Sequence, residues 1–257
     1  MRCIGIVGGM SWESTAHYYR ALNEGVKARL GGLHSARLVL HSVEFSEMEA
    51  MQREGRWDEA GRVLREAVRG LEGAGADFIL LAANTMHKVA DQMMAGSRIP
   101  LLHIVDVTAQ AARRAGLRTV GLLATRYTME CDFYVRRLEE HHGLKVLVPG
   151  PEDRAEIHRV IFEELVLGIV NPASKARFLA VARGLAGEGA EGLVAGCTEI
   201  GMLLGPGDLD MPLLDTAKLH VEAALDLALG GSLAPHEPKG PRRRATDRHE
   251  PGPGPVR

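Results

Sequence analysis

Gly189-Ala-Glu-Gly-Leu-Val-Ala-Gly-Cys-Thr-Glu199 predicts a short buried strand, Gly192 to Gly196, that ends on a cysteine and leads into a helix. A thiol at the carboxyl end of such a strand lies at the sheet edge where open α/β folds bind ligands. The helix N-terminus that follows carries a partial positive charge, so we expect it to favour the thiolate of Cys197. The alternative is that Cys197 is a small core residue, as many free cysteines are.

A second copy of this pattern lies 114 residues upstream. Gly75-Ala-Asp-Phe-Ile-Leu-Leu-Ala-Ala-Asn-Thr85 aligns with it so that Ala83 matches Cys197. Residues 5–10 and 121–126 are also similar, at an offset of 116 residues. Two similar halves predict a single cleft with Ala83 on one wall and Cys197 on the other. One wall therefore carries a methyl group where the other carries a thiol.

Strand-like runs alternate with helical segments along the chain, which is typical of βαβ units and mostly parallel sheets. Helices are expected over residues 85–94, 151–167 and 215–229, among others. We predict an α/β fold of two pseudo-symmetric domains, each a mostly parallel sheet flanked by helices. The first comprises residues 1–105 with 212–230, and the second residues 106–211. Residues 231–257 are rich in Pro, Gly and Arg and predict a disordered tail.

Charge and cysteine content exclude several classes of protein. The net charge is −2 over 257 residues, and the last 27 residues contribute six basic and three acidic side chains, so the first 230 carry −5. That balance argues against a nucleic-acid-binding surface. Three widely spaced cysteines do not form a disulfide framework and fit a reducing compartment. Without a signal region or a long apolar run, we expect a cytoplasmic protein that does not enter the membrane.

The glycine run Gly5-Ile-Val-Gly-Gly-Met10 follows a predicted strand, but it lacks the GxGxxG spacing of dinucleotide sites, and no P-loop sequence occurs. Its backbone N–H groups are suited to a small anion such as a carboxylate. The alternative is a turn that only lets strand and helix approach closely. No grouping of His, Asp and Glu has metal-ligand spacing, so we predict no metal site.

Small hydroxyl and amide side chains follow the predicted strand ends in both halves, namely Asn84, Thr85, Thr125, Thr128 and Thr198. Such groups bind a carboxylate together with helix-start N–H groups, although each alone is more often only a helix cap. Five at equivalent edges favour a binding site. His87 and His220 are weaker candidates for an acid or an orienting group, and Glu199 for tuning the thiol.

The motifs GGMSWEST (residues 8–15), ANTMH (residues 83–87) and GCTE (residues 196–199) resemble the aspartate/glutamate racemase superfamily. With LGGLHSARL, NTMHKVAD, ATRYTM and IFEEL, the sequence is similar to the broad-specificity amino-acid racemase branch, which includes L-aspartate/glutamate-specific racemases. This resemblance covers about residues 1–229. It implies two α/β domains closing over a free amino acid, a homodimer, and no pyridoxal phosphate, metal or nucleotide cofactor.

The resemblance also implies roles for individual residues. Cys197 matches the acid/base cysteine of the second half, and Asn84, Thr85 and Thr198 match residues that hold the substrate α-carboxylate. Thr125 and Thr128 belong to the same threonine cluster, and Met10 and Gln52 match positions that line the substrate. Ala83 departs from the family, which has cysteine there, or threonine in the nearest branch. Alanine transfers no proton, so Thr85, His87 or a water would have to serve.

From these observations we expect a cofactor-independent racemase acting at Cα of a small amino acid, with Asp or Glu as first choice. Cys197 is then the acid/base, opposite an unusual Ala83. One alternative is a one-cysteine decarboxylase or lyase on a malonate-like diacid, for which a more apolar, aromatic cleft is expected. The other is a weakly active amino-acid-binding protein.

Overall fold

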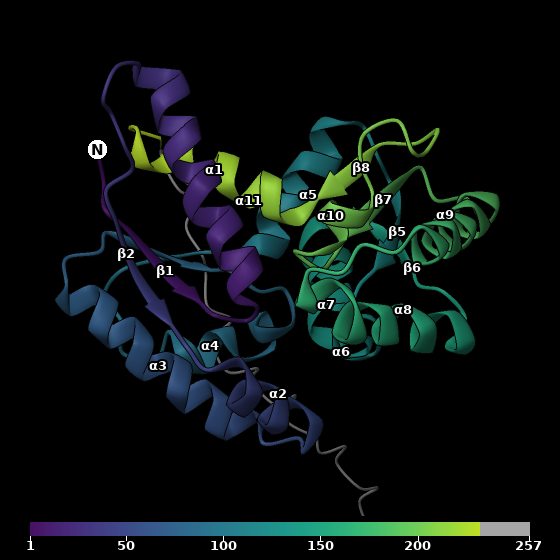
Figure 1. Cartoon of the computed structure of the whole chain (residues 1–257), viewed down its shortest axis with the longest axis horizontal. Helices are drawn as coiled ribbons and strands as arrows, with labels where there is room; N and C mark the ends of the chain where they lie inside the picture. The colour runs from purple at the N-terminus through teal and green to yellow at the C-terminus, as the bar shows by residue number, and fades with distance from the viewer. Residues whose placement is uncertain (232–257) are drawn as a thin grey trace, which may run out of the picture.

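Two four-stranded parallel sheets form the centre of the molecule in the computed structural model, which describes residues 1–231 (Figure 1). The first has the order β2-β1-β3-β4, with β1 at Ile4–Gly8, β2 at Leu38–Ser42, β3 at Phe78–Leu81 and β4 at Leu101–Leu102. The second has the order β6-β5-β7-β8, with β5 at Thr119–Leu123, β6 at Lys145–Leu147, β7 at Gly192–Ala195 and β8 at Leu213–Asp215. The predicted α/β fold of two similar parallel sheets is confirmed.

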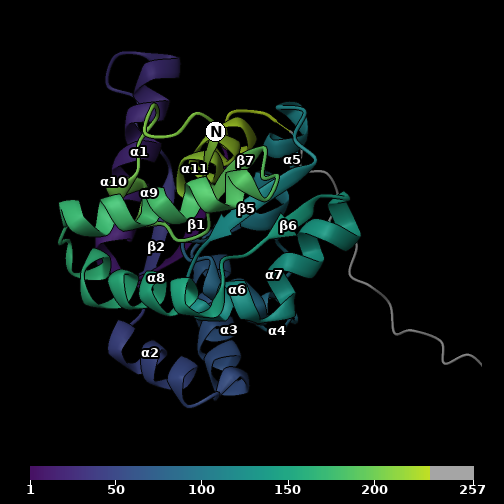
Figure 2. The same cartoon turned by 90° about the vertical axis from the view of Figure 1, so that its right-hand side faces the viewer.

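Helices cover both sheets. In Figure 1 the first sheet lies between α1 and α3, and Figure 2 shows α8 and α9 in front of the second sheet. The helices are α1 (Trp12–Leu30), α2 (Phe45–Arg53), α3 (Trp57–Gly73), α4 (Ala90–Met93), α5 (Ile104–Arg114), α6 (Arg126–Glu130), α7 (Asp132–Arg136), α8 (Pro151–Glu163), α9 (Pro172–Gly187), α10 (Ile200–Leu203) and α11 (Thr216–Ala228). Short 3₁₀ turns span Thr85–Val89 and Leu165–Leu167, and a π turn spans Arg137–His141. None of the helices within residues 1–231 is long and apolar enough to cross a membrane.

Strand register reproduces the internal repeat. Ile4 of β1 lies opposite Phe78 of β3, and Val120 of β5 lies opposite Gly192 of β7. The two strand pairs are therefore related by offsets of 116 and 114 residues, the same values as in the sequence alignment. Ala83 and Cys197 each follow the end of an equivalent strand by two residues.

Equivalent carboxylates anchor the starts of these strands. Asp77 Oδ2 accepts a hydrogen bond from the backbone N–H of Cys3 at 2.5 Å, and Glu191 Oε2 accepts one from Thr119 at 2.9 Å. Glu191 also accepts from the Arg118 backbone N–H, and the two hydrogen bonds lower the pKa of its carboxyl. In both halves, the carboxylate before β3 or β7 is therefore hydrogen-bonded to the backbone at the start of the neighbouring strand.

Two helix predictions differ from the structure. Over residues 85–94 the chain forms a 3₁₀ turn and then the short α4, because the Ala83 carbonyl accepts from the His87 ring at 2.7 Å. The His87 backbone N–H donates to the Asn84 carbonyl at 3.1 Å, the i to i−3 contact of a 3₁₀ turn. Over residues 151–167 the helix stops at Glu163, and the next turn ends at Gly168, whose φ of 72° is the left-handed conformation that glycine adopts easily.

The end of the chain joins both halves. Strand β8 pairs with β7, with Leu213 opposite Leu193, so it belongs to the second sheet although we expected residues 212–230 in the first domain. Helix α11 packs its apolar face against α1, where Val221 and Leu225 share a buried cluster with Ile4. The division into domains otherwise stays a prediction, and the predicted disordered tail lies outside the described residues apart from Gly231.

Candidate active site

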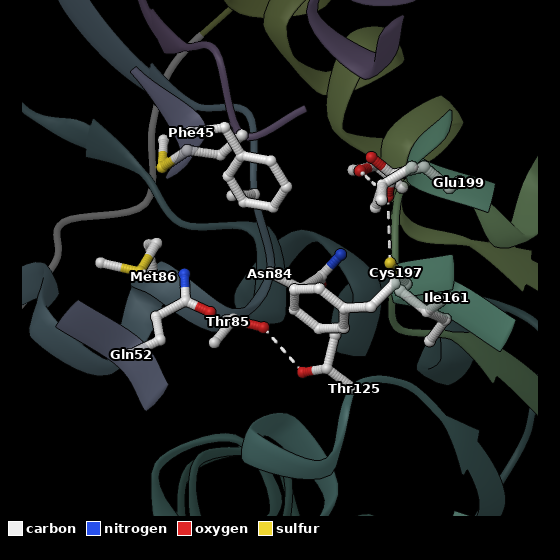
Figure 3. Close-up of a pocket in the computed structure, with 14 residues that line it drawn as sticks. Phe45, Gln52, Asn84, Thr85, Met86, Thr125, Ile161, Cys197 and Glu199 are labelled. Carbon is white, nitrogen blue, oxygen red and sulfur yellow. Dashed lines mark hydrogen bonds between the residues drawn. The ribbon is translucent and has the colours of Figure 1, made fainter. Parts of the chain in front are cut away.

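A pocket lies between the two halves, at the carboxyl ends of β1, β3, β5 and β7 (Figure 3). The predicted site residues that line it are Met10, Gln52, Ala83, Asn84, Thr85, Thr125, Cys197 and Thr198. Thr128 is the exception, since it is fully buried behind the pocket wall, where its hydroxyl contacts Thr85 and Thr125. Glu199, expected only as a weaker candidate, lines the pocket as well.

Five lining residues were not predicted as site residues, namely Phe45, Met86, Ile161, Phe162 and Val166. All are apolar, and a helical apolar stripe predicts burial without saying which buried residues meet a ligand. Ile161 and Phe162 belong to the quoted IFEEL motif, which was the only signal for them in the sequence. Phe45 and Phe162 stack across the two halves, with ring centroids 6.3 Å apart and planes at 17°.

Local packing positions the Cys197 thiol. The residue before it has no side chain because a Cβ on Gly196 would lie 2.7 Å from Leu122 and 3.0 Å from Ala124. Glycine therefore lets the chain leave β7 in close contact with β5. Cys197 is 8% exposed and lines the pocket, as does Ala83, the equivalent residue of the first half.

The thiol is hydrogen-bonded to a buried carboxylate. Cys197 Sγ lies 3.0 Å from Glu199 Oε2, which also accepts from the Thr198 hydroxyl at 2.8 Å. The other carboxylate oxygen, Oε1, accepts from the Ser11 hydroxyl at 2.7 Å. Glu199 is only 2% exposed, and within residues 1–231 no Lys, Arg or His forms an ion pair with it. Ser11 belongs to the first half, so this network also links the halves.

The environment of Cys197 differs from the expectation of a stabilised thiolate. Burial raises the pKa of the thiol well above its ordinary value, and the negative charge of Glu199 and its hydrogen bond raise it further. Backbone N–H groups of Thr198 and Glu199 act in the opposite direction but are outweighed. Helix α10 starts only at Ile200 and has four residues, so its dipole is small. The expected lowering was wrong in sign, and the resting form is the thiol.

Three threonine hydroxyls from both halves form a closed triangle. Thr85 Oγ1 lies 2.8 Å from Thr125 Oγ1 and 3.1 Å from Thr128 Oγ1, and the last two are 3.2 Å apart. All three residues are buried. A hydroxyl both donates and accepts hydrogen bonds, so the three hydroxyls can bond one another when no ligand is bound. Each can turn its hydrogen toward a substrate carboxylate when the substrate binds. Figure 3 shows the Thr85–Thr125 pair spanning the pocket floor between the halves.

Asn84 is held by groups of the second half and the last helix. Its amide nitrogen donates to Thr216 Oγ1 at 3.0 Å, and its carbonyl oxygen accepts from the Tyr134 hydroxyl at 3.2 Å. Burial raises the pKa of Tyr134, so this phenol stays a neutral donor. Both amide ends are fixed, and one N–H of Asn84, a residue that lines the pocket, is not used in these two contacts.

His87 and His220 hold the fold rather than a ligand. His87 Nδ1 donates to the Ala83 carbonyl at 2.7 Å while Nε2 accepts from the Ile104 N–H at 3.3 Å. His220 Nε2 donates to the Leu102 carbonyl at 2.8 Å, and Nδ1 lies 3.0 Å from the Tyr18 hydroxyl, which donates to it. Burial lowers the pKa of His87 to about 4 and that of His220 to about 3. Both rings are neutral with both nitrogens occupied.

The glycine turn after β1 is also occupied by the protein. Gly9 has a φ of 92°, and a Cβ there would collide with the Val43 backbone, so the turn requires glycine. Its N–H donates to Thr15 Oγ1 at 2.8 Å. The close-packing interpretation is therefore the one that the geometry supports for Gly9. Within the described part of the chain, no group of three or more His, Cys, Asp or Glu residues is arranged to hold a metal ion.

Comparisons with known proteins agree with this geometry. The family model of Asp/Glu/hydantoin racemases matches residues 7–224. A Yersinia pestis protein provisionally assigned as an Asp/Glu racemase is 47% identical, with a TM-score of 0.83 over 89% of this chain and 100% of its own. An aspartate racemase homologue from Pyrococcus horikoshii is 35% identical, with a TM-score of 0.78 over 89% of this chain and 100% of its own.

A curated relative points to the same class of enzyme. The broad-specificity amino-acid racemase RacX of Bacillus subtilis is 24% identical over 163 residues, which is 62% of this chain and 68% of that protein. Family match, fold and pocket together identify an amino-acid racemase of the isomerase class, and the chain belongs to the Asp/Glu/hydantoin racemase family.

Proposed function

We propose that this enzyme exchanges the Cα proton of a free amino acid without a cofactor, with Cys197 as the acid/base. The observation that carries the proposal is the Cys197 thiol, hydrogen-bonded to the buried Glu199 in a pocket that also presents the hydroxyls of Thr85 and Thr125. The Cα–H bond is a very weak acid, so its carbanion needs a preorganised polar site around the carboxylate. The threonine hydroxyls and the remaining N–H of Asn84 supply these donors.

Glu199 has a defined part in this reaction. Because the pKa of Cys197 is raised, its thiol must lose a proton before it acts as a base. The proton passes from Sγ to Glu199 Oε2, 3.0 Å away, which leaves a thiolate beside a neutral carboxylic acid. The thiolate then takes the Cα proton, and the bonding electrons spread into the substrate carboxylate. Return of the proton from Cys197 restores the original configuration, whereas inversion needs a proton from the opposite face.

Ala83 is the equivalent of Cys197 in the first half and lines the same pocket, so it is the residue expected on the opposite face. Alanine transfers no proton, His87 is neutral with both nitrogens bonded, and Thr85 lies in the hydroxyl triangle. A water admitted beside Ala83 is the remaining proton source. The enzyme should therefore exchange the Cα proton faster than it inverts the centre, acting as a slow, one-sided racemase.

A malonate-like diacid is the second candidate substrate. The stacked Phe45 and Phe162 give the pocket more aromatic character than the composition suggested, and one cysteine suffices for this chemistry. Loss of CO₂ would leave an enediolate on the threonine hydroxyls, and Cys197 would deliver a proton to its carbon. Release of CO₂ from an aryl- or alkylmalonate, without Cα exchange of any amino acid, would favour this reaction over the first.

The decisive variant is Cys197→Ser, tested by proton NMR with a panel of L-amino acids in D₂O. We expect loss of Cα exchange by at least about 10³-fold, because a serine hydroxyl is far less acidic than a thiol. Cys131→Ser is the matched control, a free cysteine that does not line the pocket, and it should keep full activity. Full exchange in Cys197→Ser would refute the assignment.

Assembly and location stay predictions from the resemblance and the composition. For the homodimer, the exposed apolar side chains of Trp12, Tyr19 and Leu40 on α1 and β2 offer a surface. Light scattering of the purified protein tests it, and a monomer at all concentrations would contradict it. A cytoplasmic, reducing location is consistent with free cysteines at positions 3, 131 and 197.

A further inference from the structure

We propose that the pocket selects amino acids with a neutral, largely apolar side chain over aspartate and glutamate. This inference rests on the proposed function and names the substrate class for the same site. It departs from the Asp or Glu preference that the resemblance implies, because the lining of this pocket has different chemistry.

The walls around the polar floor are apolar. Met10, Phe45 and Met86 come from the first half, and Ile161, Phe162 and Val166 from the second. Figure 3 shows Met86 and Gln52 on one side and Ile161 on the side of Cys197, with Phe45 between them above the floor. A substrate side chain that leaves the Cα between Ala83 and Cys197 therefore meets methyl, thioether and phenyl groups, which favour apolar matter.

The charge in the pocket is negative. Glu199 is the ionisable acid of the lining, and among the described lining residues no Lys, Arg or His is present to balance a second carboxylate. The α-carboxylate of any amino acid already uses the hydroxyl donors. A side-chain carboxylate would be desolvated near Glu199 with no cation beside it, which is unfavourable through both burial and like-charge repulsion.

Gln52 narrows further the class of substrate side chain that we expect. Its Nε2 donates to the Met86 thioether at 3.1 Å, and sulfur is a weak acceptor. A substrate oxygen or sulfur can replace Met86 as the acceptor, but a neutral amide does not cancel the charge of a carboxylate. We therefore expect side chains of the methionine and leucine type, with neutral amides such as glutamine next, and acidic side chains last.

The test compares pairs of nearly equal shape, L-Gln with L-Glu and L-Asn with L-Asp, together with L-Met and L-Leu. The readouts are Cα deuterium exchange in D₂O and binding to the Cys197→Ser protein by calorimetry. We expect kcat/KM for exchange of L-Met to exceed that of L-Glu by at least about tenfold, and each amide to exceed its acid. Equal or better exchange of L-Glu or L-Asp overturns this inference and leaves the proposed function standing. No exchange with any amino acid overturns both.

A gained charge provides the reciprocal test. Gln52→Arg places a cation on the apolar wall and should raise L-Glu exchange relative to L-Met by at least about tenfold. Gln110→Arg is the matched control, an exposed position on α5 away from the pocket, and it should leave that ratio unchanged. An unchanged ratio in Gln52→Arg, with the protein folded, would mean that charge in this wall does not set specificity.

Discussion

At the scale of single residues, Glu199 adds to the effect of burial in keeping Cys197 a thiol. It accepts hydrogen bonds from Cys197, Thr198 and, across the halves, Ser11, whose hydroxyl also caps α1 by accepting from the Ser14 N–H at 3.2 Å. The side chain is thus fixed by both halves. The motif GCTE indicated a helix start, which favours the thiolate. The opposite direction of the pKa shift was missed because the burial of Cys197 and of Glu199 is a tertiary property.

Glu199→Gln should separate the electrostatic and proton-accepting roles of this carboxylate. Removing the negative charge should lower the pKa of Cys197, because after burial that charge is the next cause that raises it. Alkylation of Cys197 by iodoacetamide at increasing pH, followed by mass spectrometry, compares the pH dependence of thiolate formation in the variant and the wild type. Cα exchange should fall at the same time, since glutamine cannot take the thiol proton. A faster enzyme with the lowered pKa would mean that Glu199 only repels the thiolate.

Ala83 is the second residue whose role can be tested directly. Ala83→Cys places a thiol on the face opposite Cys197, and Ala83→Thr places a hydroxyl there. Both should raise the inversion rate while exchange through Cys197 changes little, with Cys giving the larger effect because a thiol is the stronger acid. Chiral chromatography of the products measures inversion. The double variant Ala83→Cys with Cys197→Ser should have a lower inversion rate than Ala83→Cys alone. An unchanged inversion rate in both Ala83→Cys and Ala83→Thr would count against a missing proton relay.

At the scale of elements, the two buried histidines, His87 and His220, join secondary-structure elements through hydrogen bonds of their rings. ANTMH predicted a helix start with a candidate acid, but His87 instead caps the Ala83 carbonyl and accepts from α5, while His220 joins α11 to β4 and α1. Sequence periodicity located the helix that carries His220, but the segment of His87 is a 3₁₀ turn where a helix was predicted. Periodicity could not show that the His87 ring would bond the Ala83 carbonyl, because the ring is held there by the Ile104 N–H. The same holds for His220, which bonds groups more than 100 residues away in the sequence.

These histidines predict a loss of stability in acid. Burial lowers their pKa values to about 4 and about 3, below the value of about 6.5 in an unfolded chain. The unfolded state therefore binds more protons, so the stabilisation is complete above about pH 6.5 and declines as the pH falls toward the folded values. From pH 7 to pH 5 the free energy of unfolding should fall by about 4 kcal/mol from these two residues, or about 10 °C in Tm.

Thermal unfolding at pH 7, 6 and 5 measures this dependence. In His220→Phe the slope of Tm against pH should be about half that of the wild type, whatever the absolute Tm. The exposed His17→Gln on α1 is the matched control and should keep the full slope. A wild-type Tm that does not change over this range would contradict the neutral, buried state of both rings.

At the scale of the whole molecule, the repeat in the sequence predicted the two sheets and the cleft between them. The offsets of 114 and 116 residues recur in the strand register, and the polar side chains at the strand ends meet in one pocket. What the sequence did not show is the apolar part of that pocket. Phe45 and Phe162 meet only because α2 and α8 from different halves face each other. The sequence of neither helix indicates that it contacts the other.

Ala83 and Cys197 occupy equivalent positions of the two halves, and one measurement tests most directly the proposal that this asymmetry governs catalysis. An L-amino acid that is accepted by the enzyme is incubated in D₂O, and deuterium entry at Cα is followed with the appearance of the D-isomer in the same sample. We predict exchange at least about tenfold faster than inversion, with both abolished in Cys197→Ser. Inversion as fast as exchange, or exchange that survives in Cys197→Ser, would contradict the account.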